Sequence, residues 1–338
     1  MSARSVLALM YTLDLLKERG VDGAGVLQRH GLDINALDPN SEIGRDRELA
    51  ILAELLPRAE DPALGLEMGT RFGLAGYGPL TMLLMTCKNV FEGFQLGIRY
   101  QALTYLFGEL SITPGAQHTT LVITPIPLPD SVHSILMERD MVGTFRLVND
   151  IQTQLGLKLG PEEVGLPYPR PDHYQQLEDY FQCPVRFDQP HCYALIDNHT
   201  LAQEMPGYNK MAQDMYRAQC DAMLAQRQTP LDNLPARLTA YLQLFVRHFP
   251  NTAQSAQAFG VTERTFRRHL HQEGTTFQQL LDQVRCQKAC RYLQHSDYSI
   301  AAIADLLGYS ESAALVRAFE RWKGVTPARF RRQQQGDG

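Results

Sequence analysis

A repeated pattern near the C-terminus constrains the fold of this chain most strongly. In residues 252–271, and again in residues 299–321, a short apolar run at helical spacing is followed by a glycine and a second, more polar run. Three positions of the second run recur 49 residues later, where Phe266, Arg268 and Leu270 correspond to Leu315, Arg317 and Phe319. A short helix, a glycine turn and a second helix form a helix-turn-helix, whose second helix enters the major groove of DNA. Two copies in register therefore predict two DNA-reading units in one helical domain.

The residues at the helix ends support this assignment. Gly260 and Gly308 are expected to make the two turns, because glycine adopts a left-handed backbone conformation at little cost. Side-chain oxygens that cap the helix N-termini are expected at Thr252, Thr262, Ser299 and Ser310. Each unit thus has a start and a turn that its own residues specify.

A longer helix is predicted between the two units. Residues 276–293 carry apolar side chains at helical spacing, from Phe277 to Leu293. Such a helix is a rigid spacer, and adjacent major-groove entries on one face of B-DNA are about 34 Å apart. Three cations on this helix are interpreted as solvated charges, with phosphate contact as the alternative: Arg285, Lys288 and Arg291.

Charge is divided unevenly along the chain. Residues 1–227 carry 18 basic and 28 acidic residues, whereas residues 228–338 carry 14 and 9, so the net charges are −10 and +5. A basic region favours contact with nucleic acid, because neutralisation of phosphates drives affinity. The polar run that ends at Pro230 marks a boundary, since proline ends the preceding helix. We therefore predict one domain over residues 1–227 and a second over residues 228–338.

Several motifs of the second domain resemble the signature of the AraC/XylS family. They are SIAAIA at residues 299–304, LGYS at 307–310, RAF at 317–319, Trp322, GVTP at 324–327 and FR at 330–331. This resemblance covers about residues 235–332. A looser resemblance, to an AraC subgroup with an N-terminal arabinose-binding-like ligand domain, rests on GLAGYG at 73–78 and YFQCPVRF at 180–187. The resemblance implies a dimeric, sequence-specific transcription regulator, commonly an activator and often switched by a small molecule.

Helical spacing and the resemblance together select candidate DNA-contacting residues. They are Arg264, Thr265, Arg267 and Arg268 in the first unit and Ser312, Ala313, Ala314 and Arg317 in the second. By resemblance, the three arginines of the first unit take base-contacting positions, and arginine binds guanine through two hydrogen bonds. Phosphate contact by one or two of them is the alternative. Alanines can touch only a thymine methyl, so we expect the first unit to discriminate sequence and the second to position the protein through Arg317 and backbone amides.

The first domain is predicted to be α+β. Helices are expected over residues 6–19, 45–56, 90–107, 131–155, 172–181 and 207–226, and strands over residues 110–113, 119–123, 185–187 and 193–196. That mixture is typical of helices packed on a small sheet. The predicted architecture is an α+β effector and dimerisation domain followed by an all-α domain with two helix-turn-helix motifs.

The resemblance also predicts an effector pocket in the first domain. Four polar side chains beside apolar patterns are its candidates: Tyr77, Tyr105, His118 and Arg146. Packing in the core is the alternative for each, because tyrosine and arginine bury apolar stems while keeping a polar tip.

Composition and motifs argue against an enzyme. An enzyme with a DNA-targeting tail, such as an alkylation-repair protein, would need a zinc-held nucleophilic thiolate. The six cysteines, at 87, 183, 192, 220, 286 and 290, form no C-x-x-C pair and no zinc spacing. The fingerprints of nucleotide-binding and hydrolase sites are absent from the sequence as well. We expect no catalysis, no metal and no cofactor.

Location and partners follow from the same features. The longest mostly apolar stretch, residues 78–87, is too short to span a bilayer, and the N-terminus lacks the pattern of a secretory signal. We expect a cytoplasmic bacterial homodimer that joins the nucleoid when it binds double-stranded promoter or operator DNA at direct or inverted repeats. A small-molecule effector and RNA polymerase are further expected partners. Control by a protein partner or by abundance alone, without a small-molecule ligand, is the alternative.

Overall fold

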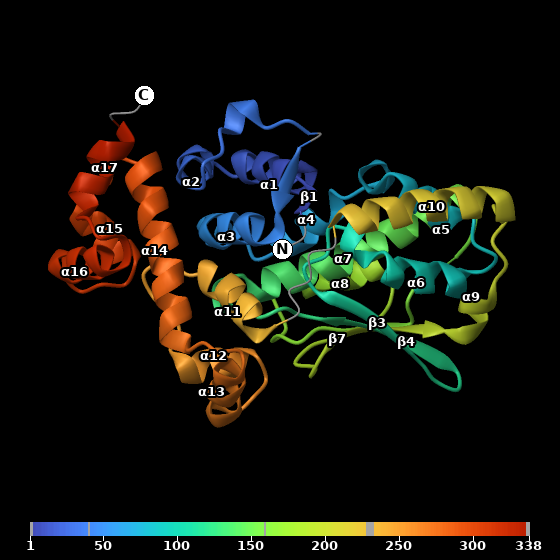
Figure 1. Ribbon diagram of the computed structural model, residues 1–338. Helices are drawn as coiled ribbons and strands as arrows, with labels where there is room; N and C mark the ends of the chain where they lie inside the picture. Colours follow the sequence, from blue (N-terminus) through green and yellow to red (C-terminus); the bar gives the residue numbers. More distant parts are fainter. Residues whose placement is uncertain (1–2, 40, 159, 228–232, 336–338) are drawn as a thin grey trace.

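The computed structural model describes residues 3–39, 41–158, 160–227 and 233–335. Figure 1 shows an N-terminal domain of helices around a sheet, drawn from blue to yellow, beside an all-helical C-terminal domain in orange and red. The boundary expected between residues 227 and 228 borders residues 228–232, which lie outside the described residues. In the part of the chain that the structure describes, no helix is long and apolar enough to cross a membrane.

The N-terminal domain alternates helices with short strands. Its strands are β1 (Ala3–Ser5), β2 (Glu42–Gly44), β3 (Glu109–Pro114), β4 (His118–Thr124), β5 (Glu163–Gly165), β6 (Val185–Arg186) and β7 (Cys192–Asp197). Its α-helices are α1 (Leu7–Glu18), α2 (Ala24–Arg29), α3 (Arg45–Leu55), α4 (Leu64–Thr70), α5 (Pro79–Met85), α6 (Val90–Arg99), α7 (Asp130–Leu155), α8 (Tyr174–Phe181), α9 (Asn198–Ala202) and α10 (Lys210–Arg227). Short 3₁₀ turns join several of them, at Ile34–Ala36, Leu56–Arg58, Leu74–Tyr77 and Gln101–Leu103.

The main sheet has five strands in the order β3-β4-β7-β5-β6. Its neighbours pair antiparallel except β5 and β6, which are parallel. Side chains of β4 alternate between buried and partly exposed, as expected for a strand with one face toward a core. The 26-residue helix α7 carries much of that core, with Leu136, Met137, Met141 and Phe145 buried. The predicted α+β class is confirmed.

The predicted helix over residues 90–107 is wrong in its second half. Helix α6 ends at Arg99, and Gln101–Leu103 form a 3₁₀ turn. The carbonyl oxygen of Tyr105 accepts hydrogen bonds from Arg4 Nη1 (3.1 Å) and Arg139 Nη1 (2.7 Å). A carbonyl that turns toward two buried guanidinium groups is unavailable to a helix, so tertiary contacts override the local helical pattern here.

The C-terminal domain consists of seven helices in the described residues. They are α11 (Leu234–Gln243), α12 (Thr252–Ala258), α13 (Glu263–Gln272), α14 (Phe277–His295), α15 (Ile300–Leu306), α16 (Ser312–Lys323) and α17 (Pro327–Gln335). In Figure 1 the long helix α14 runs between the pair α12–α13 at one end and the pair α15–α16 at the other. The structure thus contains both predicted helix-turn-helix units and the predicted helix between them.

The capping predictions are partly confirmed. Thr262 Oγ1 accepts from Thr265 N, and Ser299 Oγ accepts from Ala302 N. Thr252 was the wrong cap, because Asn251 one residue earlier forms a reciprocal capping box with Gln254. Ser310 was also wrong, since the N-cap of α16 is Glu311 and makes no side-chain capping bond.

The loop after α11 links the two reading units. Arg247 N donates to Leu306 O (2.8 Å), and Arg247 Nε donates to Asp305 Oδ2 (2.8 Å). The turn residue Gly308 has φ +72°, and a Cβ there would lie 2.4 Å from the Arg247 carbonyl oxygen. The other turn residue, Gly260, has φ +67° but open space around the same position. Gly308 is therefore required by backbone conformation and by close approach, whereas Gly260 is required by conformation alone.

Replacing each glycine by alanine separates these two requirements. We expect Gly260→Ala to lower the free energy of unfolding by about 1 kcal/mol, the strain of a left-handed alanine. Gly308→Ala should cost at least about 1 kcal/mol more, because its methyl group also displaces the Arg247 loop. Urea unfolding of the full chain, followed by circular dichroism, measures both. Equal losses would show that the contact between Arg247 and Gly308 does not constrain the second unit.

Candidate DNA-binding surface, domain interface and effector cavity

Helix α13 presents three arginines to solvent. Phe266 and Leu270 are fully buried and anchor the helix, which leaves Arg264, Arg267 and Arg268 on the exposed face. Arg267 donates to Glu263 Oε1 from Nη2 (2.6 Å) and from Nε (2.8 Å), an exposed pair one helical turn apart. Such pairs contribute only a few tenths of a kcal/mol, so Arg267 can exchange this partner for DNA at little cost. Thr265 is partly exposed beside the cap.

Helix α16 presents a smaller and less charged surface. Leu315 and Phe319 are buried, as their counterparts in α13 are. Ser312, Ala313 and Arg317 are exposed and Ala314 is partly exposed. The structure therefore places the predicted DNA-contacting residues on the outer faces of the two second helices, and their contacts with DNA remain predictions.

The three cations of α14 are not the solvated charges that the sequence suggested. Arg285 packs between two rings, with its guanidinium carbon 5.1 Å from the centroid of Phe249 and 4.8 Å from that of Tyr309. Lys288 is 2% exposed. Arg291 is partly buried and donates from Nη1 to His30 Nδ1 (3.0 Å). Helical spacing could not reveal this, because the partners lie outside the helix: those of Arg285 lie elsewhere in the C-terminal domain, and His30 is 261 residues from Arg291 in the chain.

A charged cluster joins the two domains at α14. Glu54, at the end of α3, accepts from Arg29 Nη2 (2.9 Å) and from His30 Nε2 (2.9 Å). Arg29 Nη1 also donates to the hydroxyl of Tyr298, beyond the end of α14 (3.1 Å). A neutral His30 with its proton on Nε2 satisfies both neighbours. Nε2 then donates to Glu54, and Nδ1 accepts from Arg291. This imidazole bridges the domains.

The pKa values in this cluster are shifted by burial and by the excess of cationic groups over carboxylates. Burial acts to raise the pKa of Glu54, but the hydrogen bonds from His30 and Arg29, with the charge of Lys288, outweigh it and lower that pKa to about 2. Burial lowers the pKa of His30 below its usual value, and the charges of Arg291 and Lys288 act in the same direction. Burial also lowers the pKa of Lys288 to about 8. One carboxylate thus balances several cationic groups, and its charge holds the interface together.

Neutralising Glu54 tests this dependence. Glu54→Gln keeps the shape of the side chain but leaves the cations of α14 and α2 without a counter-charge, so the free energy of unfolding should fall by about 3 kcal/mol. Glu18→Gln is the matched control, because Glu18 also pairs with an arginine, Arg71, but on the exposed surface. We expect the control to lose less than about 1 kcal/mol. Urea unfolding, with hydrogen exchange of the α14 amides, measures both; equal losses would contradict the role given to Glu54.

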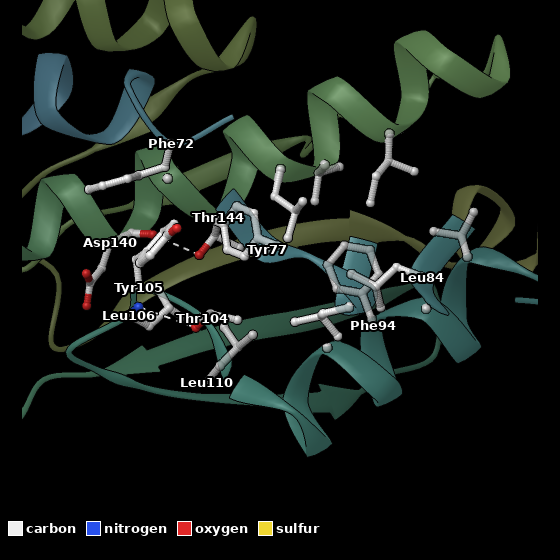
Figure 2. Close-up of a pocket in the computed structure, with 18 of the residues that line it drawn as sticks. Phe72, Tyr77, Leu84, Phe94, Thr104, Tyr105, Leu106, Leu110, Asp140 and Thr144 are labelled. Carbon is white, nitrogen blue, oxygen red and sulfur yellow. Dashed lines mark hydrogen bonds between the residues drawn. The ribbon is translucent and has the colours of Figure 1, made fainter. Parts of the chain in front are cut away.

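A cavity lies inside the N-terminal domain, bordered by α5, α6 and α7 (Figure 2). Its volume is about 90 Å³. Most of the lining is aliphatic or aromatic, as at Phe72, Leu80, Leu84, Phe94, Leu147 and Ile151. The polar lining residues are Tyr77, Thr104, Tyr105, Arg139, Asp140 and Thr144. A mostly apolar cavity with a few polar groups is the usual form of a small-molecule site.

Two of the four predicted pocket residues reach this cavity. Tyr77 and Tyr105 line it with their ring centroids 5.0 Å apart, and the Tyr105 hydroxyl donates to Gly76 O (2.6 Å). His118 lies instead at the start of β4, where its Nε2 is 2.7 Å from Glu162 Oε2 near the surface. Arg146 lies on α7 between two lining residues, Thr144 and Leu147, but does not line the cavity and pairs with Asp150 instead. The structure does not bring these two to the cavity.

The sequence interpretation missed Arg139 and Asp140. Both are almost fully buried in the middle of α7, and Arg139 Nη1 donates to Asp140 Oδ1 (2.6 Å). A signal was present, because the run Met137-Glu138-Arg139-Asp140-Met141 places three adjacent charges inside an otherwise apolar helix. Charges that are buried despite their desolvation cost commonly have a functional partner.

Family models match a part of each of the two domains. The model described as the arabinose-binding domain of AraC transcription regulators, N-terminal, matches residues 20–205. A helix-turn-helix domain model matches residues 255–333.

Individual proteins also match this chain, over different shares of its length. The ornithine utilization regulator of Pseudomonas aeruginosa is 28% identical over 326 residues, which cover 94% of this chain and 93% of that protein. The transcriptional activator CfaD of Escherichia coli is 40% identical over 75 residues, 22% of this chain and 28% of that protein. The crystal structure of the transcriptional regulator CdpR from Pseudomonas aeruginosa covers 95% of this chain and 98% of its own, at 21% identity and a TM-score of 0.43.

These matches concern transcription regulators rather than enzymes. The N-terminal model alone spans more than half of the chain, and the helix-turn-helix model covers most of the rest. The chain therefore belongs to the AraC family of transcription regulators, with a ligand-binding N-terminal domain and a helix-turn-helix DNA-binding domain.

Proposed function

We propose that this regulator acts as a homodimeric transcription activator in which each protomer reads two adjacent major-groove sites. The observation that carries the proposal is the pair of helix-turn-helix units at the two ends of α14, each with its second helix exposed. The domains extend over residues 1–227 and 228–338, and a small molecule in the N-terminal cavity controls the activity. RNA polymerase is the partner at the promoter.

The chemistry of the two second helices supports an unequal division of work. Arg264, Arg267 and Arg268 offer bidentate donors for guanine, with Thr265 beside them, whereas Ser312, Ala313 and Ala314 offer one hydroxyl and two methyl groups. Arg317 supplies a cation for phosphate. The first unit thus discriminates sequence, and the second fixes register and orientation.

One relative supports the activator role, and the exposed surface supports the homodimer. CfaD, which matches over 75 residues of this chain, is described as an activator. Large apolar side chains are exposed on and near α10, at Tyr208, Met211 and Met215, and on the adjoining α5, at Met82. Met211 is 85% exposed. An apolar patch of this kind is typical of a protein interface, and we assign it to the contact between two copies of the chain.

A regulator that has no small-molecule ligand is the second candidate. The cavity favours the ligand-controlled form, because a cavity that stays unfilled costs stability. Titration of the full-length protein with candidate ligands separates the two.

Selection from a random DNA pool, followed by sequencing, tests the division between the two units. We expect the full-length protein to enrich one motif with a guanine-containing box for the first unit and, about one helical turn away, a box with a weaker base preference for the second. Arg267→Ala should relax the preference at one or two base pairs, at a cost of about 1–3 kcal/mol. Arg317→Ala should weaken binding to all sequences alike and reduce the dependence of affinity on salt. Equal loss of discrimination in the two variants would refute the division.

Sedimentation equilibrium tests the contact between copies. Met211→Lys puts a charge into the centre of the patch, so it should raise the dimer dissociation constant at least about ten-fold. Lys210→Met is the control on the same helix, because Lys210 pairs with Asp214 outside the patch and its loss should leave the dimer intact. A wild-type chain that sediments as a monomer, or a Met211→Lys chain that remains fully dimeric, would show that the assignment of α10 is wrong.

A further inference from the structure

The polar and apolar residues of the cavity are separated along its length. In Figure 2, Thr104, Tyr105, Asp140 and Thr144 gather at one end, whereas Leu84 and Phe94 lie toward the other. A sugar would bury several hydroxyl groups, each of which needs a hydrogen-bonding partner. The apolar end offers none of these partners, so the cavity suits a ligand with a polar head and an apolar body.

Arg139, at the polar end, has one unused edge. Its Nη1 donates to Tyr105 O (2.7 Å) and to Asp140 Oδ1 (2.6 Å), but the buried Nε and Nη2 have no hydrogen-bond partner among the residues that the structure describes. The rings of Phe72 and Phe107 cover the guanidinium, with centroids 4.7 and 4.8 Å from its central carbon. Nε and Nη2 form the edge of a guanidinium that holds a carboxylate through two parallel hydrogen bonds. Leaving both donors unpaired in the interior is costly.

The charged groups around Phe107 also include unpaired donors. Arg4, Arg45 and Arg139 all approach this ring, at 4.0, 5.9 and 4.8 Å from its centroid. Carboxylates lie close to all three: Glu48 pairs with Arg4, Asp140 pairs with Arg139, and Asp46 and Glu109 act on Arg45 together with Asp140.

The unpaired buried groups of this cluster are mostly donors. Its buried atoms without partners include four donors, Arg4 Nη2, Arg45 Nε and the two of Arg139, and one acceptor, Glu48 Oε1. Burial of this cluster lowers the pKa of Arg45 to about 10, and the charge of Arg4 contributes to the same shift. A carboxylate would supply acceptors for donors of this kind.

We propose that the cavity binds a monocarboxylate with an apolar chain or ring, whose carboxylate pairs with the Nε–Nη2 edge of Arg139. The apolar body lies against Leu84, Phe94 and Ile151. This inference rests on the proposed function of the N-terminal domain as an effector-binding domain and names the chemical class of that effector.

Matched acids and alcohols test the head group. Isothermal titration of the full-length protein would compare octanoate with octan-1-ol and 4-phenylbutyrate with 4-phenylbutan-1-ol. We expect at least one acid to bind about ten-fold or more tightly than its alcohol, because only the acid uses the free edge of Arg139. If neither acid binds, or if each acid binds no more tightly than its alcohol, the proposal is overturned.

Variants test the location. Gly97 on α6 lines the cavity, and a Cβ there meets no atom within 4 Å, so Gly97→Leu should fill the cavity and abolish binding while favouring the helix. Gly25→Leu, at an exposed position on α2, is the control and should bind as the wild type does. Arg139→Lys keeps the charge but loses the edge that makes two parallel hydrogen bonds. It should weaken acid binding about ten-fold without affecting binding of the alcohol. Acid binding that survives Gly97→Leu, or that a folded Arg139→Lys variant retains in full, contradicts the proposal.

The selected DNA motif separates this inference from the proposed function. Recovery of the motif without acid binding would remove the inference alone. Acid binding by a protein that enriches no DNA motif would leave the inference standing and remove the proposed function. Should Arg139→Lys fail to fold, the comparison of acids with alcohols and the Gly97→Leu variant decide the result.

Discussion

The arrangement of the two domains depends on how the carboxylate of Glu54 is shared. It accepts from Arg29 and His30 of its own domain, and His30 in turn accepts from Arg291 of α14. Lys288, buried beside them, adds a further positive charge. This cluster adds to an apolar contact, because buried side chains of α11 belong to the same continuous core as those of the N-terminal domain. The contact between the two domains is therefore both apolar and ionic.

Helix α14 is the element on which the rest of the DNA-binding domain is assembled. It separates the two helix-turn-helix units, and Arg285 on it packs against Phe249 before the first unit and Tyr309 in the second. The contact of Arg247 with the turn at Gly308 adds a second link between the units. Docking of the N-terminal domain on α14 therefore acts on the helix that sets the separation of both units.

Helix α3 connects the cavity with this interface. Arg45 and Glu48, in its first turn, belong to the charge cluster around Phe107, and Glu54, in its last turn, belongs to the cluster against α14. Eleven residues of one helix thus span the distance between the anion-binding end of the cavity and the DNA-binding domain. A ligand that changes the position of α3 would change both clusters, and by linkage DNA binding would change the affinity for that ligand equally.

The sequence by itself determined the elements whose signals are local. Apolar spacing, turn glycines and the capping oxygens of Thr262 and Ser299 sufficed for the two helix-turn-helix units, the helix between them and most of the sheet, because these signals act within a few residues. Only the tertiary structure decided what covers each charge: it buried Lys288, bridged Arg291 to His30, left His118 and Arg146 outside the cavity and placed Arg139 inside it. The physical reason is that the environment of a charged side chain is set by residues distant in the chain, so local periodicity shows which face the side chain occupies but not what packs against that face.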